Sequence, residues 1–281
     1  SPRDGFATNA PVTTTRASPH NTTLLPSKLA GGGKGGFATA VEHPFPVDAA
    51  DHCETPLQAY QDLVVVLDQM VVRLQQQQHH QHTVVFQRSD LRIYDPYYCD
   101  GGVKTKLAAL GYTNVINKNR DFYHDIHTNA IPEYDILITN PPYSGEHIEQ
   151  LLQYIVNNKN KPCFLLLPHF VYTKDYYERT IGKQQNSNTY NNGTPPPSSF
   201  FYFLIPEHRY AYVPPEWVTA PGGGSKALAK GKETTSPFPS FWYCHVPAPA
   251  VSSSAKKKNK KKSQQQQQQQ HTTWLETTFG T

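Results

Sequence analysis

The segment that decides the fold reads Tyr-Asp-Ile-Leu-Ile-Thr-Asn-Pro-Pro-Tyr-Ser, residues 134–144. Its first part is a short apolar run of the length of a buried strand. The run ends in asparagine, two prolines and an aromatic residue. Because proline fixes φ and restricts the residue before it, the chain must leave the strand as a rigid, extended turn. We therefore predict a core strand that presents Asn140, Pro141, Pro142 and Tyr143 at its carboxyl end.

Short apolar runs alternate with helix-like segments on both sides of this strand. Strand alternating with helix indicates a parallel sheet that is covered by helices on both faces. We predict an α/β domain with a mostly parallel, seven-stranded sheet and an antiparallel edge strand. The expected strands are 91–94, 115–116, 134–139, 164–167, 200–206, 210–213 and 241–246, and the expected helices are 56–74, 103–110 and 147–156.

Low-complexity segments flank and interrupt this domain. Residues 1–44 are rich in Thr, Ala, Gly and Pro, and residues 251–281 are rich in Lys and Gln. Within the domain, 45–250, we expect a Gln/His insert at 75–82 and a second polar insert at 185–199. Segments of such composition bury too little apolar surface to fold. The sequence therefore predicts one folded domain between a disordered leader and a disordered tail.

The composition argues against several classes of protein. Four cysteines are scattered without CxxC spacing, which argues against a zinc knuckle and against a secreted, disulfide-bonded module. No apolar run approaches the roughly 18 residues that a membrane span needs. We expect an intracellular protein of the nucleus or cytoplasm, with no membrane and no metal. Arg3 and Arg16 among Ser and Thr residues leave an organelle transit peptide open as an alternative.

The positive charge belongs to the tail. The chain has a net charge of +4, and six lysines lie within Lys256–Lys262, so the remainder carries a net charge of −2. A lysine run can bind phosphates or act as a nuclear-import signal, and a solvated tail explains it equally well. If the partner is a nucleic acid, we expect part of its binding to come from this run.

The Asn-Pro-Pro-Tyr turn is suited to holding a planar amino group. The two prolines have no N–H, so their carbonyl oxygens and the Asn140 side-chain oxygen form a set of acceptors beside the Tyr143 ring. Hydrogen bonds from an NH2 group to these acceptors draw its nitrogen toward a tetrahedral geometry and free the lone pair for attack. The ring stacks on the plane of the same group. Such a site orients a nucleophile and stabilises charge without a covalent intermediate.

A second turn follows the strand expected at 91–94. It contains Asp95-Pro96-Tyr97 and, shortly afterwards, Gly101-Gly102. An acid at a strand end can hold a cationic or hydroxyl-bearing ligand, and glycine lets the backbone approach that ligand closely. The spacing matches neither the GxxxxGK[ST] phosphate loop nor the glycines of a dinucleotide fold. An ordinary tight turn between strand and helix explains the glycine pair equally well.

Together, these turns, about 45 residues apart, resemble those of the S-adenosylmethionine-dependent amino-methyltransferases over roughly residues 51–246. This family includes adenine-N6 methyltransferases of DNA and RNA and the release-factor glutamine methyltransferases. The resemblance implies a Rossmann-like class I methyltransferase fold and methyl transfer from S-adenosyl-L-methionine to an exocyclic amino group. Adenine N6 in DNA or RNA is the preferred target, and a protein glutamine is the alternative. A catalytically inactive scaffold or nucleic-acid adaptor is a third interpretation.

The resemblance also assigns roles to individual residues. Asn140, Pro141, Pro142 and Tyr143 would hold the target amine. The methionine end of the cofactor would be held by Asp95, Pro96, Tyr97 and Gly101, with Thr55 at the start of the first helix. The adenine of the cofactor would lie beside Asp121 and Phe122. A plain helix cap explains Thr55 equally well.

Three features depart from the family pattern. Cys99 stands where the family usually has its first glycine. The acid expected to bind the cofactor ribose is absent, and Asn117 and Asn119 occupy that region. About four residues separate this strand from Asp121, so the usual helix should be shortened or missing. The first two departures favour the scaffold interpretation, whereas the intact turn at 140–143 opposes it.

Further aromatic residues have two interpretations. Tyr172, Tyr176 and Tyr177, together with Lys174, follow the strand expected at 164–167, where they could contact a substrate or complete a tyrosine-rich core. The residues at 241–243, Phe-Trp-Tyr, are more typical of a core than of a base-stacking surface.

Overall fold

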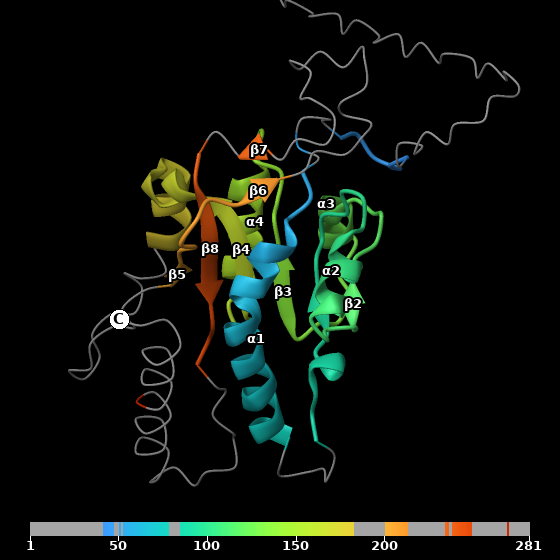
Figure 1. Ribbon diagram of the computed structural model, residues 1–281. Coiled ribbons are helices and arrows are strands. Elements are labelled where there is room, and N and C mark those ends of the chain that lie inside the picture. Colours follow the sequence, from blue (N-terminus) through green and yellow to red (C-terminus); the bar gives the residue numbers. More distant parts are fainter. Residues whose placement is uncertain are drawn as a thin grey trace, which may run out of the picture. The chain divides into compact units, whose positions relative to one another are not determined.

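The computed structural model describes residues 42–47, 51, 53–78, 85–182, 200–212, 234–235 and 238–248, together with residue 269 (Figure 1). Its regular elements include α-helices (α), short 3₁₀ or π segments (η) and strands (β). In chain order they are α1 (Leu57–Gln78), η2 (Arg88–Asp90), β1 (Ile93–Tyr94), α2 (Val103–Ala109), β2 (Val115–Ile116), α3 (Phe122–His127), β3 (Ile136–Thr139), α4 (His147–Asn157), β4 (Cys163–Pro168), η3 (His169–Thr173), α5 (Asp175–Tyr177), η4 (Glu178–Gly182), β5 (Tyr202–Leu204), β6 (Ala211–Tyr212), β7 (Thr234–Thr235) and β8 (Ser240–His245).

Six strands form one mixed sheet in the order β2-β1-β3-β4-β8-β5. The pairs β2–β1, β1–β3 and β3–β4 are parallel. Strand β8 runs antiparallel to both of its neighbours, β4 and β5. The longest pairing joins β4 to β8, with Leu165 opposite Tyr243. The predicted α/β fold with a mostly parallel sheet is confirmed in this form.

One detail of the predicted sheet is corrected, and its antiparallel edge is present as the pair of β8 with β5. The segment expected as a strand at 210–213 forms β6, which pairs with β7 in a separate two-stranded sheet, so the main sheet has six described strands. The antiparallel strand β8 lies inside the sheet, and β5 forms the edge. The corrected detail concerns a strand partner, which the apolar pattern of a single strand does not specify.

Successive residues of each strand point to opposite faces of the sheet, so two cores form. On one face, Ile136, Phe164 and Trp242 pack against α1 and α2. On the other face, Leu137 and Tyr243 pack in a core with α3 and α4. Figure 1 shows α1 in front of the sheet and α4 behind it. Phe241, Trp242 and Tyr243 are all buried, as expected of core residues, and Tyr177 is buried as well.

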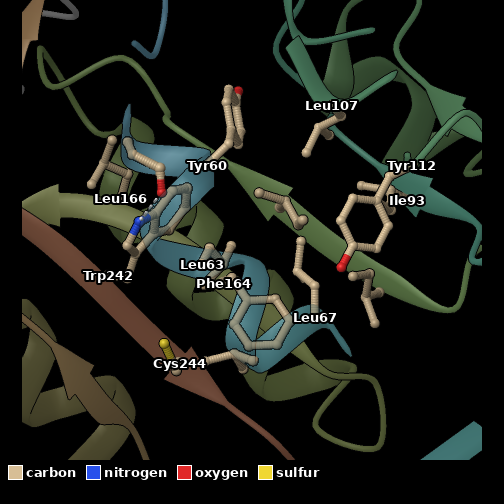
Figure 2. Close-up of a cluster of buried hydrophobic side chains, with 14 of the residues drawn as sticks. Tyr60, Leu63, Leu67, Ile93, Leu107, Tyr112, Phe164, Leu166, Trp242 and Cys244 are labelled. Atoms are coloured by element: carbon tan, nitrogen blue, oxygen red, sulfur yellow. Dashed lines mark hydrogen bonds between the residues drawn. The ribbon is translucent and has the colours of Figure 1, made fainter. Parts of the chain in front are cut away.

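Helix α1 holds the first of these cores together. Leu63, Leu67 and Met70 recur at spacings of three and four residues and are almost fully buried. Trp242 from β8 donates a hydrogen bond from its Nε1 to the Ala59 carbonyl oxygen at 3.0 Å, which links the helix to β8. Figure 2 shows Leu63 and Leu67 close to Phe164, with Trp242 beside them.

Some predicted boundaries move. Helix α1 continues through Gln78, so the first half of the insert expected at 75–82 is its last turn. Glutamine is a good helix former, which explains the extension. Residues 42–44, expected in the leader, lie with the domain. The rest of the leader, residues 79–82, the insert at 185–199 and the tail apart from residue 269 lie outside the described residues.

The packing of α1 predicts a contrast between two substitutions on the same helix. Leu67→Ala should lower the free energy of unfolding by about 2–5 kcal/mol, because it removes buried methyl groups and leaves a cavity. Val65→Ala is the matched control, since Val65 is 62% exposed, and it should change stability by no more than about 0.5 kcal/mol. Urea denaturation of both variants measures the difference. Equal losses would contradict this assignment of the helix faces.

Candidate functional site

The two predicted turns meet at the carboxyl edge of the sheet because β1 and β3 are neighbours in it. The chain leaves β1 toward β2 through α2, on the face that α1 covers, and leaves β3 toward β4 through α4, on the opposite face. The connections therefore diverge between β1 and β3. In an open α/β sheet, this divergence leaves a crevice where ligands bind.

A buried hydrogen bond joins the two strand ends. The Thr139 hydroxyl donates to Oδ1 of Asp95 at 2.6 Å, and the backbone N–H of Tyr97 donates to the same oxygen at 3.2 Å. Asp95 is only 6% exposed, and burial raises the pKa of its carboxyl to about 7, although the two hydrogen bonds oppose this shift. Near neutral pH the group is thus present in both forms. A nearby cation would favour the ionised form.

Two cavities adjoin the turns. The larger, of about 870 Å³, includes open solvent in its volume, and the smaller has about 300 Å³. Asn140 and Tyr97 line both. Every residue predicted to hold a cofactor lines at least one cavity. The larger cavity is lined by Pro96, Tyr97, Asp121 and Phe122. The smaller cavity is lined by Thr55, Asp95, Tyr97 and Gly101. Among the residues predicted to hold an amine, Pro142 lines the larger cavity, whereas Pro141 and Tyr143 line neither of the two.

The Asn-Pro-Pro-Tyr turn is held by its own hydrogen bonds. The Tyr143 hydroxyl donates its one proton to Oδ1 of Asn140 at 2.8 Å, with the Leu166 carbonyl oxygen as a second, longer acceptor at 3.1 Å. The Asn140 amide nitrogen donates to the Cys53 carbonyl oxygen at 3.4 Å. One acceptor position that the sequence left open is therefore taken by Tyr143. An amide oxygen has two lone pairs, so Asn140 can accept one further hydrogen bond.

The turn after β1 shows why cysteine is an unusual residue at position 99. Cys99 has a φ of 36°, and Gly101 has a φ of 79°, so both lie in the left-handed region that favours glycine. A left-handed conformation costs a non-glycine residue roughly 1–2 kcal/mol. At Gly101, a Cβ atom would also lie 2.9 Å from the Tyr98 hydroxyl oxygen. The loop therefore keeps a glycine-like backbone at Cys99, at a cost in strain.

Glu54 is a site residue that sequence reasoning did not single out. Its carboxylate accepts hydrogen bonds from the Gly102 backbone N–H and from the Lys106 ammonium, each at 2.7 Å. These contacts tie the start of α1 to the turn after β1. The charge of Glu54 also contributes to the raised pKa of Asp95. The acidic segment at 51–56 was a visible signal, but Lys106 lies some 50 residues away in the sequence.

Asp121 and Phe122 lie at the start of α3. Oδ1 of Asp121 caps this helix by accepting from the backbone N–H groups of Tyr123 and His124 at 2.9 and 3.3 Å. Phe122 is buried, and its ring lies 5.4 Å from that of Tyr97 in an edge-to-face contact. No helix lies in the described stretch between β2 and Asp121, where the sequence predicted a shortened or missing one, and the six-residue helix α3 follows Asp121.

A chain of hydroxyl groups follows the wall of the larger cavity. The hydroxyl oxygens of Tyr97 and Tyr123 lie 2.9 Å apart, and that of Tyr123 lies 2.7 Å from Nδ1 of His147. Burial raises the pKa of Tyr123 to about 12, so this phenol is neutral at physiological pH. The larger cavity thus has hydrogen-bonding groups on its wall besides the predicted residues.

The segment at 42–47 forms another part of this wall, which its low-complexity sequence did not indicate. The Asn119 side chain donates from Nδ2 to the Glu42 carbonyl oxygen at 2.8 Å, and its Oδ1 lies 2.9 Å from Nδ1 of His43. Phe45, Pro46 and Val47 line the larger cavity. Asn119 therefore anchors the segment that precedes α1.

Asn117 supports the turn after β1. Its side-chain Nδ2 donates to the carbonyl oxygens of Asp95 and Tyr97 at 3.1 and 3.2 Å. Neither Asn117 nor Asn119 lines the two cavities. The structure therefore gives no direct substitute, at these two positions, for the missing ribose-binding acid.

Some predicted features are not placed at the site. Lys256–Lys262 lies outside the described residues. Within the described part of the chain, no group of three or more His, Cys, Asp and Glu residues is arranged to hold a metal ion. None of the described helices is long and apolar enough to cross a membrane.

Comparison with known proteins identified no relatives of this chain. No protein-family model, no curated protein and no solved structure matches the chain. The residues and their geometry therefore carry the functional argument.

Proposed function

We propose that this protein transfers a methyl group from S-adenosyl-L-methionine to an exocyclic amino nitrogen, with adenine N6 in DNA or RNA as the preferred target. One observation carries the proposal: the Asp95 turn and the Asn140 turn lie at the ends of adjacent parallel strands and share the same cavities. In this proposal, the acidic group of the first turn binds a cationic cofactor, and the acceptors of the second turn bind an amine. The Rossmann-like class I methyltransferase fold is part of the proposal.

The lining of the cavities suits the proposed cofactor. S-adenosylmethionine carries an ammonium and a sulfonium, and the smaller cavity is lined by Asp95 and by Glu54, whose charge is paired with that of Lys106. Asp95 is therefore the carboxyl group that we propose for the cationic cofactor. Asp121 uses Oδ1 to cap α3, which leaves Oδ2 to accept from an adenine amino group beside Phe122. When bound, the cofactor supplies the methyl group that the amine nitrogen attacks.

In the proposed mechanism, Asn140 and Tyr143 act together on the target amine. The Tyr143 hydroxyl holds the Asn140 amide in one orientation, and the remaining lone pair of Oδ1 accepts from the amine. This hydrogen bond strengthens as the nitrogen becomes tetrahedral, so its energy lowers the barrier rather than only tightening binding.

The segment before α1 contacts both the Asn140 turn and the Asp95 turn. Asp51 accepts hydrogen bonds from the backbone N–H and the hydroxyl of Ser144, directly after Tyr143, and the Cys53 carbonyl oxygen accepts from Asn140. Glu54, three residues after Asp51, binds the turn after β1. One short stretch of chain thus holds both halves of the proposed site.

A protein glutamine is the second candidate target. The net charge of −2 outside the lysine run favours it, because adenine enzymes are expected to present a basic face to nucleic acid. An inactive scaffold or nucleic-acid adaptor is the third candidate. The glutamine alternative differs from the proposal in its substrate, and the scaffold alternative differs in having lost cofactor binding.

The first prediction concerns the pH dependence of cofactor binding. S-adenosylmethionine should bind with a dissociation constant of about 1–10 µM. Without ligand, the Asp95 pKa is about 7, and a bound cation should lower it. Binding below pH 7 should therefore release up to one proton, and affinity should rise with pH up to about 7 and then level off. Titration calorimetry at pH 6.5 in buffers of different ionisation enthalpy measures the released proton.

Asp95→Asn is the matched variant for this experiment. It keeps the size of the side chain and removes the titrating group, so it should weaken binding and abolish both the proton release and the dependence on pH. Wild-type heats that do not change with the buffer would contradict the assigned role of Asp95. No binding of the cofactor or its demethylated product would support the scaffold alternative.

The second prediction separates chemistry from cofactor binding. Asn140→Ala should reduce turnover by about a hundredfold or more while cofactor affinity stays within a few-fold, because the lost hydrogen bond acts mainly in the transition state. Tyr143→Phe keeps the ring but loses the hydroxyl that orients Asn140, so its turnover should fall less. Mass spectrometry of adenine-containing oligonucleotides and glutamine peptides identifies the product. Equal losses of affinity and turnover in Asn140→Ala would instead make Asn140 a support of the cofactor cavity.

A further inference from the structure

A row of aromatic side chains continues outward from Tyr143. The Tyr143 ring lies 5.9 Å from that of Phe238, and the Phe238 ring lies 5.0 Å from that of Phe170. His169 lies next, with its ring 5.5 Å from Phe170. These residues come from three segments, namely the loop after β3, the approach to β8, and η3 after β4. We refer to Tyr143, Phe238, Phe170 and His169 as the aromatic row.

The aromatic row lies at the surface. All four side chains are partly exposed. Phe170 meets both Phe238 and His169 at steep angles, 82° and 78°, so these rings contact edge to face. In such a contact, one ring presents its edge, and its own faces are not covered by that partner. The row therefore differs from a closed stack.

A positive charge lies at the outer end of the row. Lys174 is exposed, and its ammonium lies over the Phe170 ring, 4.9 Å from the ring centroid, so it covers one face of that ring. Asp175 and Glu178 follow it closely in the sequence and are exposed as well, so the charge around Lys174 is mixed. This part of the surface can hold one phosphate beside an aromatic ring, but it does not form a broad basic face.

We propose that the aromatic row binds the nucleotide next to the target adenine in a single-stranded nucleic acid. Its base takes the place of the Lys174 ammonium over the Phe170 ring, and this ammonium then binds its phosphate. This inference rests on the proposed function, because it places the target amine at Asn140 and Tyr143, where the row begins. It deepens that function by naming an unpaired strand as the substrate.

The chemistry of the row favours this partner over the alternatives. Aromatic rings with a nearby cation are the usual means of binding unpaired bases, because every base has a face that can stack. In a duplex, neighbouring base pairs already cover both faces of each base. A peptide that presents a glutamine offers a flat group only where it contains an aromatic or proline residue, whereas every base of an unpaired strand offers one.

The test measures binding of short, fluorescently labelled single-stranded RNA oligonucleotides that contain one adenine. One has normal bases on both sides of the adenine, and two others have an abasic nucleotide on one side. Fluorescence anisotropy with the wild-type protein should show weaker binding, by roughly tenfold, for one of the abasic oligonucleotides. Phe170→Ala should weaken binding of the normal oligonucleotide by a similar factor and should lose the difference between the normal and abasic strands.

Tyr172→Ala is the matched control. Tyr172 is an aromatic residue of the same element, η3, and is 50% exposed, but its ring contacts Phe203 of β5 at 6.0 Å instead of the row. This variant should bind all oligonucleotides as the wild type does. Cofactor titration of each variant verifies that the domain is folded.

Lys174→Ala provides a second test that does not depend on removing a packed ring. Loss of one phosphate contact should reduce the slope of log affinity against log salt by about 0.7 for a single strand. An unchanged slope, together with equal binding of normal and abasic strands by the wild type, would overturn the inference.

Substrate assays distinguish failure of this inference from failure of the proposed function. If the wild type methylates the adenine but the Phe170→Ala and Lys174→Ala variants bind oligonucleotides normally, the inference is wrong and the function stands. If the protein methylates a glutamine peptide and no adenine, both the adenine target and the aromatic-row inference are wrong. Preference for a duplex over the single strand would also overturn the inference.

Discussion

The candidate site depends on the buried hydrogen bond between Thr139 and Asp95, which joins the ends of β1 and β3. It keeps a carboxyl group in the interior, where its pKa rises to about 7, and it sets the distance between the two turns that follow these strands. Because the adjacent strands are parallel, both turns emerge at the same edge of the sheet. A single short contact thus relates the proposed cofactor-binding turn to the proposed amine-binding turn.

The segment before α1 adds a second constraint. Asp51, Cys53 and Glu54 each bind a different part of the two turns, and the helix that follows them is held on the sheet by Leu63, Leu67 and Trp242. Packing of the core therefore fixes the position of the segment that joins the two halves of the site. This coupling explains how short strands of two to four residues can support a defined cavity.

Much of the fold and site was predictable because the relevant patterns are local. The apolar run before Asn140 identified β3, and the three- and four-residue spacing of Leu63, Leu67 and Met70 identified α1. The parallel order of strands then required the turns at Asp95 and Asn140 to share an edge. The residues placed around the cavities by resemblance do line them, except Pro141 and Tyr143. The partner of β6 and the edge position of β5 were not predictable, since one strand's pattern does not identify its neighbour.

The sequence by itself determined the α/β class, the main helices and strands and the chemical character of the two turns, because these follow from residue spacing and from the restrictions of proline. Only the tertiary structure decided which groups meet across long sequence separations. Glu54 binds Lys106, and Asn119 forms hydrogen bonds with the segment at 42–47. The Phe238 ring contacts those of both Tyr143 and Phe170. Such contacts depend on how the layers pack, and packing places residues side by side without leaving a periodic signal in the chain.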